Sequence, residues 1–387
     1  MSRCRVIYLT PTFQSYRLPV FEELARVWPR DFRVVALANP GAIEERRAIA
    51  AGAFARTLVA GDWIALSQRH HDGRGTPTGV LLAPGVLPAL VRFRPKIVIV
   101  NNFSLWTICA MLAKSWGAKV LIFSEGTCHT ERSVGAGRLA IRRWLARRAS
   151  AFVVNGTMAR EYVESLGVAS DRIVEGGMGL DVDGVRRTSE ATPDSVVDSL
   201  RRELRLVRPT LLTVCRLVRG KGITHLLTAL AILQRKRIQT SLVVVGEGPE
   251  RQVLEEQCRR DGLRDVHFVG RVPAERVPIY HRVADVFVLP TLQDNWSLAV
   301  AEAMASGLPI ITSVYNGLGP DLVRDGENGF VVTPENVQEF ARTIGIFADA
   351  PREKIAQMGE RSRDLIMQYR PERVAAAYVK AVEIATR

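Results

Sequence analysis

Short, continuously apolar runs recur along the chain, and segments of a different character separate them. In the first half these runs are rich in Val and Ile and do not alternate with polar residues, which is typical of parallel strands buried on both faces. They are residues 5–10, 32–38, 96–102, 118–124 and 151–156. We interpret the segments 17–28, 105–117 and 138–150 as helices between them. A strand followed by a helix, repeated, predicts a doubly wound α/β sheet.

The same pattern restarts after residue 208. Apolar runs follow at 209–217, 240–248, 265–272, 285–291 and 308–313. We therefore expect two Rossmann-like α/β domains, residues 1–185 and residues 209–368, joined by a polar linker at 186–208 whose later part is helical. Open α/β sheets bind ligands at the carboxyl ends of their strands. We expect the two domains to face each other across a cleft that holds the active site.

Composition agrees with two soluble domains, and charge adds a hint about partners. The chain has 387 residues, 47% hydrophobic and 24% charged, which excludes the low-hydrophobicity disordered class. The net charge is +13, and residues 1–183 carry 24 Lys/Arg against 15 Asp/Glu, compared with 29 against 25 in the remainder. Such a basic half attracts phosphate-bearing partners, whether nucleotides, anionic membranes or nucleic acids.

The five cysteines indicate a reducing compartment. They are odd in number, scattered and without paired metal-type spacing: Cys4, Cys109, Cys128, Cys215 and Cys258. We expect free thiols and no metal site. No stretch approaches the roughly 18 uncharged apolar residues of a spanning helix. The predicted location is therefore the cytoplasm, with a peripheral position on the inner face of the cytoplasmic membrane as the alternative.

A basic loop follows the first strand of the second half. Arg216 and Lys221 stand between that strand and the helix that follows Gly222. Cations beside a helix N-terminus suit a diphosphate, because the helix end adds free amides and partial positive charge. A solvated basic loop is the alternative interpretation.

The next strand ends in two glycines, Gly246 and Gly248, before another helix. A dinucleotide fingerprint needs a third glycine, which is absent, so the pattern is weak support for NAD. A simple strand-to-helix turn explains both glycines, and so does a backbone packed closely beside a nucleobase.

Two carboxylates flank the start of an alanine-rich helix in residues 289–309. Ser297 or a neighbour can cap this helix, which leaves amides at Asn295, Trp296, Ser297 and Leu298 to face an anion or sugar hydroxyls. Glu302 then lies about 7 to 8 Å along the axis from the helix start, a spacing that suits a ribose one diphosphate away. Alternatively, Asp294 is a turn residue and Glu302 a surface charge.

His129 follows the fourth strand of the first half, with Glu125 nearby. A histidine at a strand end can face a cleft and act on a proton, although a lone histidine is more often structural.

The helix at 137–149 gathers five arginines around Leu139, Trp144 and Leu145. This composition suits anionic lipid headgroups. A basic, solvated helix face whose apolar residues pack inward is the alternative.

Taken together, the motifs between Pro209 and Val332 resemble the C-terminal half of family 4 retaining glycosyltransferases, which have the GT-B fold. The carrying stretches are "CRLVRGKGITHLLTAL", "LVVVGEGPERQVLEE", "VHFVGRV", "ADVFVLPT", "DNWSLAVAEAMASGLPIITS" and "DLVRDGENGFVV". The first half is similar only through "YRLPVFEEL", "SEGTCHTER" and "GGMGLD".

The resemblance implies that Arg216 and Lys221 stabilise a departing nucleotide diphosphate and that Glu302 holds the donor ribose. Asp294 stands where the family's E-x7-E motif has its first glutamate, and is one methylene shorter. Residues matching the family's donor side are Gly246 and Asn295 to Leu298. His129 is then a catalytic candidate.

On the acceptor side, the resemblance implies Tyr16, Arg17 and Glu125. Residues 369–387 are expected to form a helix that returns to the N-terminal domain.

The implied reaction is transfer of a hexose-type sugar from a nucleotide-diphosphate donor to a hydroxyl of a glycan or lipid-linked acceptor, with retention and without a metal or other cofactor. Glycolipid or surface polysaccharide biosynthesis is the expected setting. The alternative enzyme is a nucleotide-sugar epimerase or hydrolase on a similar scaffold. A nucleic-acid-binding protein is disfavoured, because no nucleic-acid module or cluster of stacking aromatics accompanies the charge.

Overall fold

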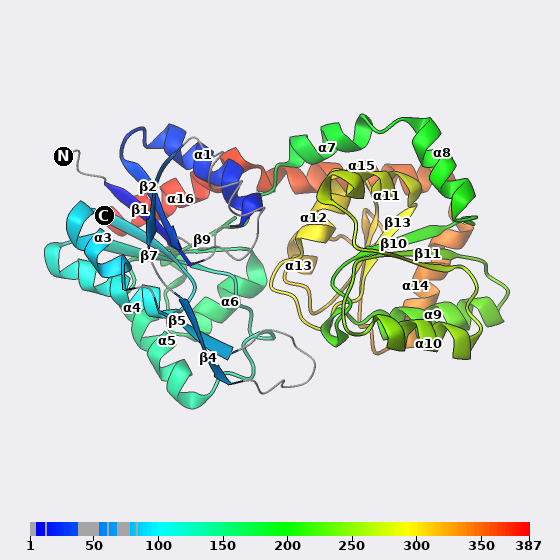
Figure 1. Ribbon diagram of the computed structural model, residues 1–387, viewed down its shortest axis with the longest axis horizontal. Coiled ribbons are helices and arrows are strands. Elements are labelled where there is room, and N and C mark those ends of the chain that lie inside the picture. The colour runs from blue at the N-terminus through cyan, green and yellow to red at the C-terminus, as the bar shows by residue number, and fades with distance from the viewer. Residues whose placement is uncertain (1–4, 12–13, 38–53, 60–61, 68–77, 83) are drawn as a thin grey trace. The chain divides into compact units, whose positions relative to one another are not determined.

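The chain forms two compact α/β units, shown in Figure 1 for the computed structural model, which describes residues 5–11, 14–37, 54–59, 62–67, 78–82 and 84–387. The N-terminal unit runs to Asp181 and includes Gln368–Arg387 from the end of the chain. The C-terminal unit contains Val182–Met367. Cys4 lies outside the described residues.

Seven parallel strands form the sheet of the N-terminal unit, in the order β3-β2-β1-β6-β7-β8-β9. Their bounds are β1 Val6–Thr10, β2 Phe32–Leu37, β3 Ala55–Val59, β6 Ile97–Asn101, β7 Lys119–Ser124, β8 Ala151–Val154 and β9 Ile173–Glu175. A separate antiparallel pair consists of β4 (Asp62–Ser67) and β5 (Thr78–Leu82).

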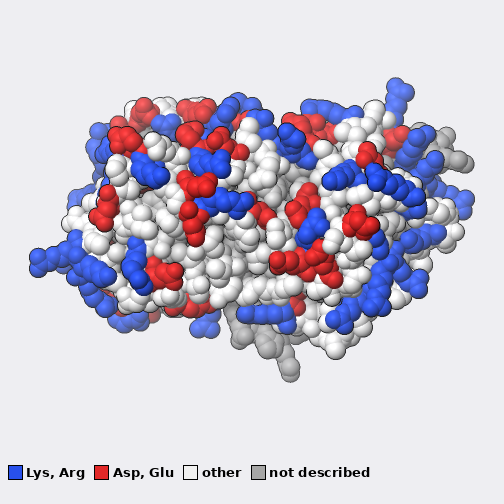
Figure 2. Space-filling model, turned by 180° about the vertical axis from the view of Figure 1, so that it is seen from behind, with Lys and Arg blue, Asp and Glu red and all other residues white. Residues whose placement is uncertain are grey.

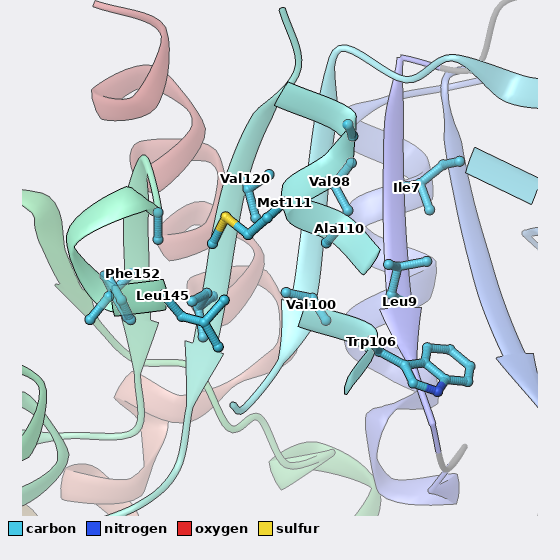
Figure 3. Close-up of a cluster of buried hydrophobic side chains, with 14 of the residues drawn as sticks. Ile7, Leu9, Val98, Val100, Trp106, Ala110, Met111, Val120, Leu145 and Phe152 are labelled. Atoms are coloured by element: carbon cyan, nitrogen blue, oxygen red, sulfur yellow. The ribbon is translucent and has the colours of Figure 1, made fainter. Parts of the chain in front are cut away.

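Each central strand of this sheet is apolar on both faces because helices cover both. Ile7 and Leu9 of β1 join one buried cluster, and Val6 and Tyr8 join the other. The first cluster includes side chains of four helices and is shown in Figure 3. These helices are α3 Val86–Phe93, α4 Leu105–Leu112, α5 Ala136–Arg148 and α6 Thr157–Ser165. Burial on both faces explains why the strands read as continuous apolar runs.

The second face is covered by helices from opposite ends of the chain. α1 (Leu18–Val27) and α16 (Pro371–Thr386) contact each other, and α16 also contacts β7, β8 and β9. Tyr378 of α16 is fully buried there against Tyr8 and Phe123. The final helix, expected to return to the first domain, thus supplies part of the core of the N-terminal unit.

Six parallel strands form the sheet of the C-terminal unit, in the order β12-β11-β10-β13-β14-β15. Their bounds are β10 Thr210–Val214, β11 Ser241–Val245, β12 Val266–Gly270, β13 Val286–Leu289, β14 Ile310–Ser313 and β15 Gly329–Val332. The expected pair of Rossmann-like sheets is confirmed.

Helices cover both faces of this second sheet (Figure 1). On one side lie α9 (Ile223–Arg235), α10 (Arg251–Asp261) and α14 (Val337–Asp349), whose apolar residues share a cluster with β10, β11 and β13. On the other lie α11 (Val277–Val283), α12 (Leu298–Ala305) and α15 (Arg352–Ile366). The short α13 spans Gly319–Leu322.

The segment 186–208, expected as a linker, is largely helical. Most of it belongs to α7 (Val182–Glu190) and α8 (Asp194–Glu203), and both helices contact α11 of the C-terminal unit. Arg201 of α8 donates to the carbonyl of Val283 at 2.7 Å. The polar composition of this segment therefore reflects two surface helices that each bury one narrow face.

In both sheets the chain order reverses beside the first strand of the unit. β1 lies between β2 and β6, and β10 lies between β11 and β13. Loops that leave the carboxyl ends of the strands on either side of such a switch point diverge and create a ligand crevice. Within the described residues, no helix combines the length and apolarity needed to cross a bilayer.

One buried carboxylate clamps the amino ends of the two central strands in the C-terminal unit. Asp285 lies just before β13. Its Oδ2 accepts a hydrogen bond from the amide of Thr210 at 2.8 Å, and its Oδ1 forms an ion pair with Arg208 Nη1 at 3.1 Å. Its own amide donates to the Thr210 carbonyl.

We expect Asp285→Ala to lower the free energy of unfolding of the C-terminal unit by about 3 kcal/mol, because a buried amide and a cation lose their acceptor. Urea unfolding followed by tryptophan fluorescence measures this. The matched control is Asp265→Ala: Asp265 precedes β12 in the same way, but its carboxylate accepts no hydrogen bond within the described part of the chain. Equal losses in the two variants would contradict the clamp.

Candidate active site

The predicted cations lie where the C-terminal sheet reverses its strand order. Arg216 follows β10 and is exposed, and no described residue accepts a hydrogen bond from its guanidinium. Lys221 ends a short 3-10 helix, Arg219–Lys221, and α9 begins two residues later. Arg216 therefore remains available for a ligand, and Lys221 lies beside a helix N-terminus.

A close backbone approach locks this loop to the one that follows β13. A Cβ on Gly222, which has φ of +68°, would lie 2.0 Å from the carbonyl oxygen of Pro290. The carbonyl of Gly220 accepts two hydrogen bonds, from the Leu292 amide at 2.8 Å and from the Thr291 hydroxyl at 3.0 Å. Glycine at 222 is thus required by both conformation and space.

Lys221 and Asp294 then form an ion pair across the two loops. The Lys221 Nζ lies 2.6 Å from Asp294 Oδ2, and both side chains are largely buried. A pair this close holds the ammonium at a fixed point beside the α9 N-terminus. The structure thus brings together two residues that are 73 positions apart in the sequence.

Asp294 is also tied to the loop that follows β14. Its amide donates to the carbonyl of Tyr315, and its carbonyl accepts from the amide of Gly317 at 3.1 Å. Its second carboxylate oxygen accepts from the amide of Trp296 at 3.2 Å. Asp294 therefore links the loops that follow β10, β13 and β14, which are neighbouring strands of the sheet.

The fourth loop, after β11, packs on the β10 loop through its glycines. A Cβ on Gly246 would lie 1.8 Å from the carbonyl oxygen of Cys215, and one on Gly248 would lie 2.2 Å from that of Leu217. Gly246 has φ of +137°, a conformation that side chains rarely adopt. The two glycines let neighbouring backbones approach, which agrees with the close-packed interpretation of this turn.

The N-terminus of α12 faces this junction with little side-chain capping. Ser297 occupies the N-cap position, but its side chain makes no capping hydrogen bond. The Asn295 Oδ1 atom is buried and has no hydrogen-bond partner among the described residues. The first amides of a helix have no partner within the helix. The Trp296 amide, which was expected to face a ligand, instead donates to Asp294 Oδ1 at 3.2 Å. The amides of Ser297 and Leu298 have no partner among the described residues and can donate to an external acceptor.

Glu302 lies one turn further along α12 and is largely buried. Burial raises the pKa of its carboxyl to about 7. No described residue gives this carboxylate a hydrogen bond or an ion pair. A buried acid without a partner is costly to ionise, and hydroxyl donors from a ligand would remove that cost.

The acceptor-side candidates lie together at the switch point of the N-terminal sheet. Arg17 is buried, pairs with Glu125, and donates to Tyr8 and Asn101 at 3.1 and 3.2 Å. Burial alone would lower the pKa of Arg17, but Tyr8 and Glu125 raise it well above its usual range. The guanidinium therefore contacts side chains of β1, of β6 and of the loop after β7, and holds these three segments together.

The two remaining candidates of the N-terminal unit are Tyr16, which precedes Arg17, and His129, which follows Glu125 by four residues. Tyr16 is half-buried, and its hydroxyl lies 3.5 Å from Arg17 Nε. Burial raises the pKa of Tyr16. His129 is half-buried in the turn after β7. Their roles toward a ligand stay predictions.

Some residues that shape the sites were absent from the sequence-based prediction. Thr291 and Gly222 join the two central loops, and Tyr8, Asn101 and Tyr378 surround Arg17. The glycine beside Lys221 was a visible signal. The others look like ordinary strand or helix residues, so only the fold reveals their contacts.

Comparisons with known proteins agree with this architecture. Residues 198–365 match the family Glycosyl transferases group 1, and residues 19–175 match the family Glycosyl transferase 4-like domain. The two matches fall in different units and together span most of the chain.

Curated relatives share part of the sequence. A GDP-mannose-dependent alpha-(1-6)-phosphatidylinositol monomannoside mannosyltransferase of Mycobacterium tuberculosis is 31% identical over 209 residues, covering 51% of this chain and 52% of its own. The alpha-D-kanosaminyltransferase of Streptomyces kanamyceticus is 30% identical over 177 residues, covering 44% and 46%. The chain thus spans about half the length of the curated relatives it matches.

Solved structures match over nearly the whole chain. HepE of Anabaena, solved in complex with UDP, has a TM-score of 0.76 at 18% identity and covers 98% of this chain and 99% of its own. Sucrose-phosphate synthase of Thermosynechococcus elongatus has a TM-score of 0.67 at 18% identity, with 98% of both chains covered. At these identities the likeness shows the fold.

Two parallel Rossmann-like sheets, a family match in each unit and whole-chain structural neighbours lead to one conclusion: the chain belongs to the family 4, group 1 glycosyltransferases of the GT-B fold.

Proposed function

We propose that the chain transfers a hexose-type sugar from a nucleotide-diphosphate donor to an acceptor hydroxyl, with retention of anomeric configuration. The observation that carries the proposal is Glu302, a largely buried carboxylate with a pKa raised to about 7 and no described partner. The two ribose hydroxyls of a nucleotide are donors that fit such an acceptor. HepE in complex with UDP supports a nucleotide donor.

The diphosphate would lie between Glu302 and the two cations. The guanidinium of Arg216 has no partner among the described residues, and the Lys221 Nζ lies 2.6 Å from Asp294 Oδ2. An arginine fork binds two phosphate oxygens, and the α9 and α12 N-termini add amides and positive potential. The donor's nucleoside would rest against the glycine turn at Gly246.

In the reaction, the bond between the anomeric carbon and the β-phosphate oxygen breaks, and its electron pair leaves with the diphosphate. The acceptor oxygen bonds to the anomeric carbon, and its proton leaves with the diphosphate. Arg216 and Lys221 stabilise the charge that develops on the leaving group, the role that a divalent cation has in other transferases. His129 and the cluster of Tyr16, Arg17 and Glu125 are proposed to act in the N-terminal unit on the sugar and acceptor.

The acceptor is proposed to be a lipid-linked glycan or glycolipid handled at the cytoplasmic side of a membrane. A relative that matches half of the chain acts on phosphatidylinositol monomannoside, as its name states. The basic excess of the N-terminal half fits an acidic acceptor of this kind.

The function is tested with radiolabelled UDP- and GDP-sugars and a membrane extract as acceptor. We expect a labelled glycolipid or glycan that forms only when acceptor is present, and transfer that persists in EDTA. The productive donor should also raise the melting temperature of the protein, because a ligand of the folded state stabilises it. Free sugar released without acceptor would instead indicate a hydrolase, and loss of transfer in EDTA would contradict the metal-free mechanism.

Charge removal at the junction should reduce transfer while leaving the fold intact. We expect Lys221→Ala and Arg216→Ala each to lower kcat/KM by roughly 100-fold or more, since each removes a cation from the developing negative charge. The matched control is Arg219→Ala in the same short helix; Arg219 is exposed and lies 3.9 Å from Glu250. Losses of the same size in all three variants would mean that charge in this loop acts only at long range.

The raised pKa of Glu302 makes stability depend on pH. Its carboxyl titrates at about 4.5 when unfolded and about 7 in the folded chain, so ionisation disfavours the folded state. This cost is absent below pH 4.5, grows as pH rises, and is complete above pH 7 at about 3 kcal/mol. We expect Glu302→Gln to gain stability relative to the native chain over this window, measured by urea unfolding at several pH values.

Donor affinity should change with pH in the opposite sense. Because ribose hydroxyls bind the ionised carboxylate best, affinity for the nucleotide sugar is expected to rise as pH increases through 7 and to stay flat in Glu302→Gln. Calorimetric titration measures both. Parallel pH profiles of the native chain and the variant would remove Glu302 from the donor site.

A further inference from the structure

The outer faces of three neighbouring helices in the N-terminal unit carry large apolar side chains. α4 contacts both α3 and α5, and all three helices pack on the same buried cluster. On the side away from that cluster, six large side chains are exposed. They are Leu87 and Val91 of α3, Ile108 and Leu112 of α4, and Ile141 and Trp144 of α5. We call this surface the α3–α5 face.

These six exposed side chains are distinct from the residues that the three helices bury in the core. Each helix already buries a separate stripe, with Leu90, Met111 and Leu145 facing the sheet. The exposed fractions outside are large: 61% for Val91 and 55% for Leu112. On α3 and α4 the exposed pair is spaced by four residues, so it forms a second line along the helix. A second apolar stripe on adjacent helices indicates a surface that contacts something else.

Cations outnumber acids in the sequence segments that form this surface, although Glu125, Glu131 and Glu161 border them and Glu131 pairs with Arg142 of α5. Residues 84–124, which include α3 and α4, hold five Lys/Arg, and residues 132–160, which include α5, hold seven; neither segment contains Asp or Glu. In Figure 2, blue Lys and Arg side chains predominate along the lower right edge. Burial, followed by the charges of Lys119, Arg172 and Arg148, lowers the pKa of Lys114 in this region.

The opposite side of the same sheet has a different character. There the acids and cations nearly balance: α1 has two acids and one arginine, and α16 has two acids and two cations, whereas α5 alone has five arginines and no acid. The positive charge of the N-terminal half is therefore concentrated on one of its two helical layers. A positive net charge on the N-terminal unit would not by itself place the excess of cations on one helical layer.

One tryptophan joins the apolar and basic parts of the surface. Trp144 is 46% exposed, and the Arg148 guanidinium lies 4.8 Å from its ring centroid. Lys114, after α4, donates to the Arg148 carbonyl at 2.9 Å and so joins α5 to the α4 side. Exposed aliphatic side chains with a tryptophan and arginines match the boundary between lipid headgroups and acyl chains.

We propose that the α3–α5 face docks on an anionic lipid bilayer. Charge complementarity selects the anionic surface, and the six apolar side chains enter the region below the headgroups. A nucleic acid would match the charge but not the aliphatic side chains. The α3–α5 face belongs to the N-terminal unit and Glu302 to the C-terminal unit, so lipid binding can be tested independently of the proposed donor chemistry.

The test uses the full chain and vesicles of phosphatidylcholine with or without roughly one third phosphatidylglycerol, in flotation assays at low and high salt. We expect retention only by the anionic vesicles, weakened by salt. Arg143→Glu combined with Arg147→Glu should reduce partitioning by roughly 30-fold or more, because each basic residue near the surface adds about a fivefold factor. Leu112→Ser combined with Trp144→Ser should abolish the retention that remains at high salt.

Matched controls lie on α10 of the other unit. Val253 is 52% exposed, and Arg259 and Arg260 are exposed, so Val253→Ser and Arg259→Glu with Arg260→Glu remove similar groups elsewhere. These controls should float like the native chain, and circular dichroism should show every variant folded. Equal losses in controls and α3–α5 variants would overturn the proposal. Absence of flotation of the native chain would also overturn it. A native dimer in light scattering that Leu112→Ser combined with Trp144→Ser converts to a monomer would overturn it as well, because the face would then bind a second copy of the chain.

Discussion

The close contact between the loops that follow β10 and β13 is the constraint on which the C-terminal site depends. The Pro290 carbonyl occupies the place where a side chain at 222 would lie, and the Gly220 carbonyl accepts two hydrogen bonds from the opposite loop. With the backbones held this close, Lys221 and Asp294 meet at 2.6 Å, and Asp294 in turn holds the loop after β14. The position of the Lys221 ammonium thus follows from backbone geometry at the switch point, and the exposed Arg216 side chain extends from the start of the same loop.

Around this rigid junction, the groups available to a ligand are those that the protein leaves without partners. The Arg216 guanidinium, the Asn295 side-chain Oδ1 and the Glu302 carboxylate lack hydrogen-bond partners among the described residues. The raised pKa of Glu302 reflects this isolation, because a buried carboxyl that no donor stabilises resists ionisation. By contrast, the Arg17 cluster in the N-terminal unit is satisfied within the protein, which fits a rigid platform.

The fold class and most central strands could be predicted from sequence because strands buried on both faces have uninterrupted apolar runs. Strands at the edges escaped this signal: β3, with the sequence ARTLV, is largely exposed, and β9 has only three residues. The polar segment at 186–208 was interpreted as a linker because α7 and α8 bury few apolar residues. The positions of Arg216, Lys221 and Glu302 were predictable from motif spacing. The Lys221–Asp294 ion pair and the isolation of Glu302 were not, since both depend on which loops the strand order brings together.

The proposed donor site depends most on Glu302 accepting hydrogen bonds from the ribose of a nucleotide sugar. Calorimetric titration of the productive donor and its 2′-deoxy and 3′-deoxy ribose analogues, against the native chain and Glu302→Gln, tests it as a double-mutant cycle. We expect the native chain to lose roughly 10- to 100-fold in affinity for at least one analogue, because a charged hydrogen bond is lost, and the variant to show little further loss. Equal losses in the native chain and the variant would contradict it.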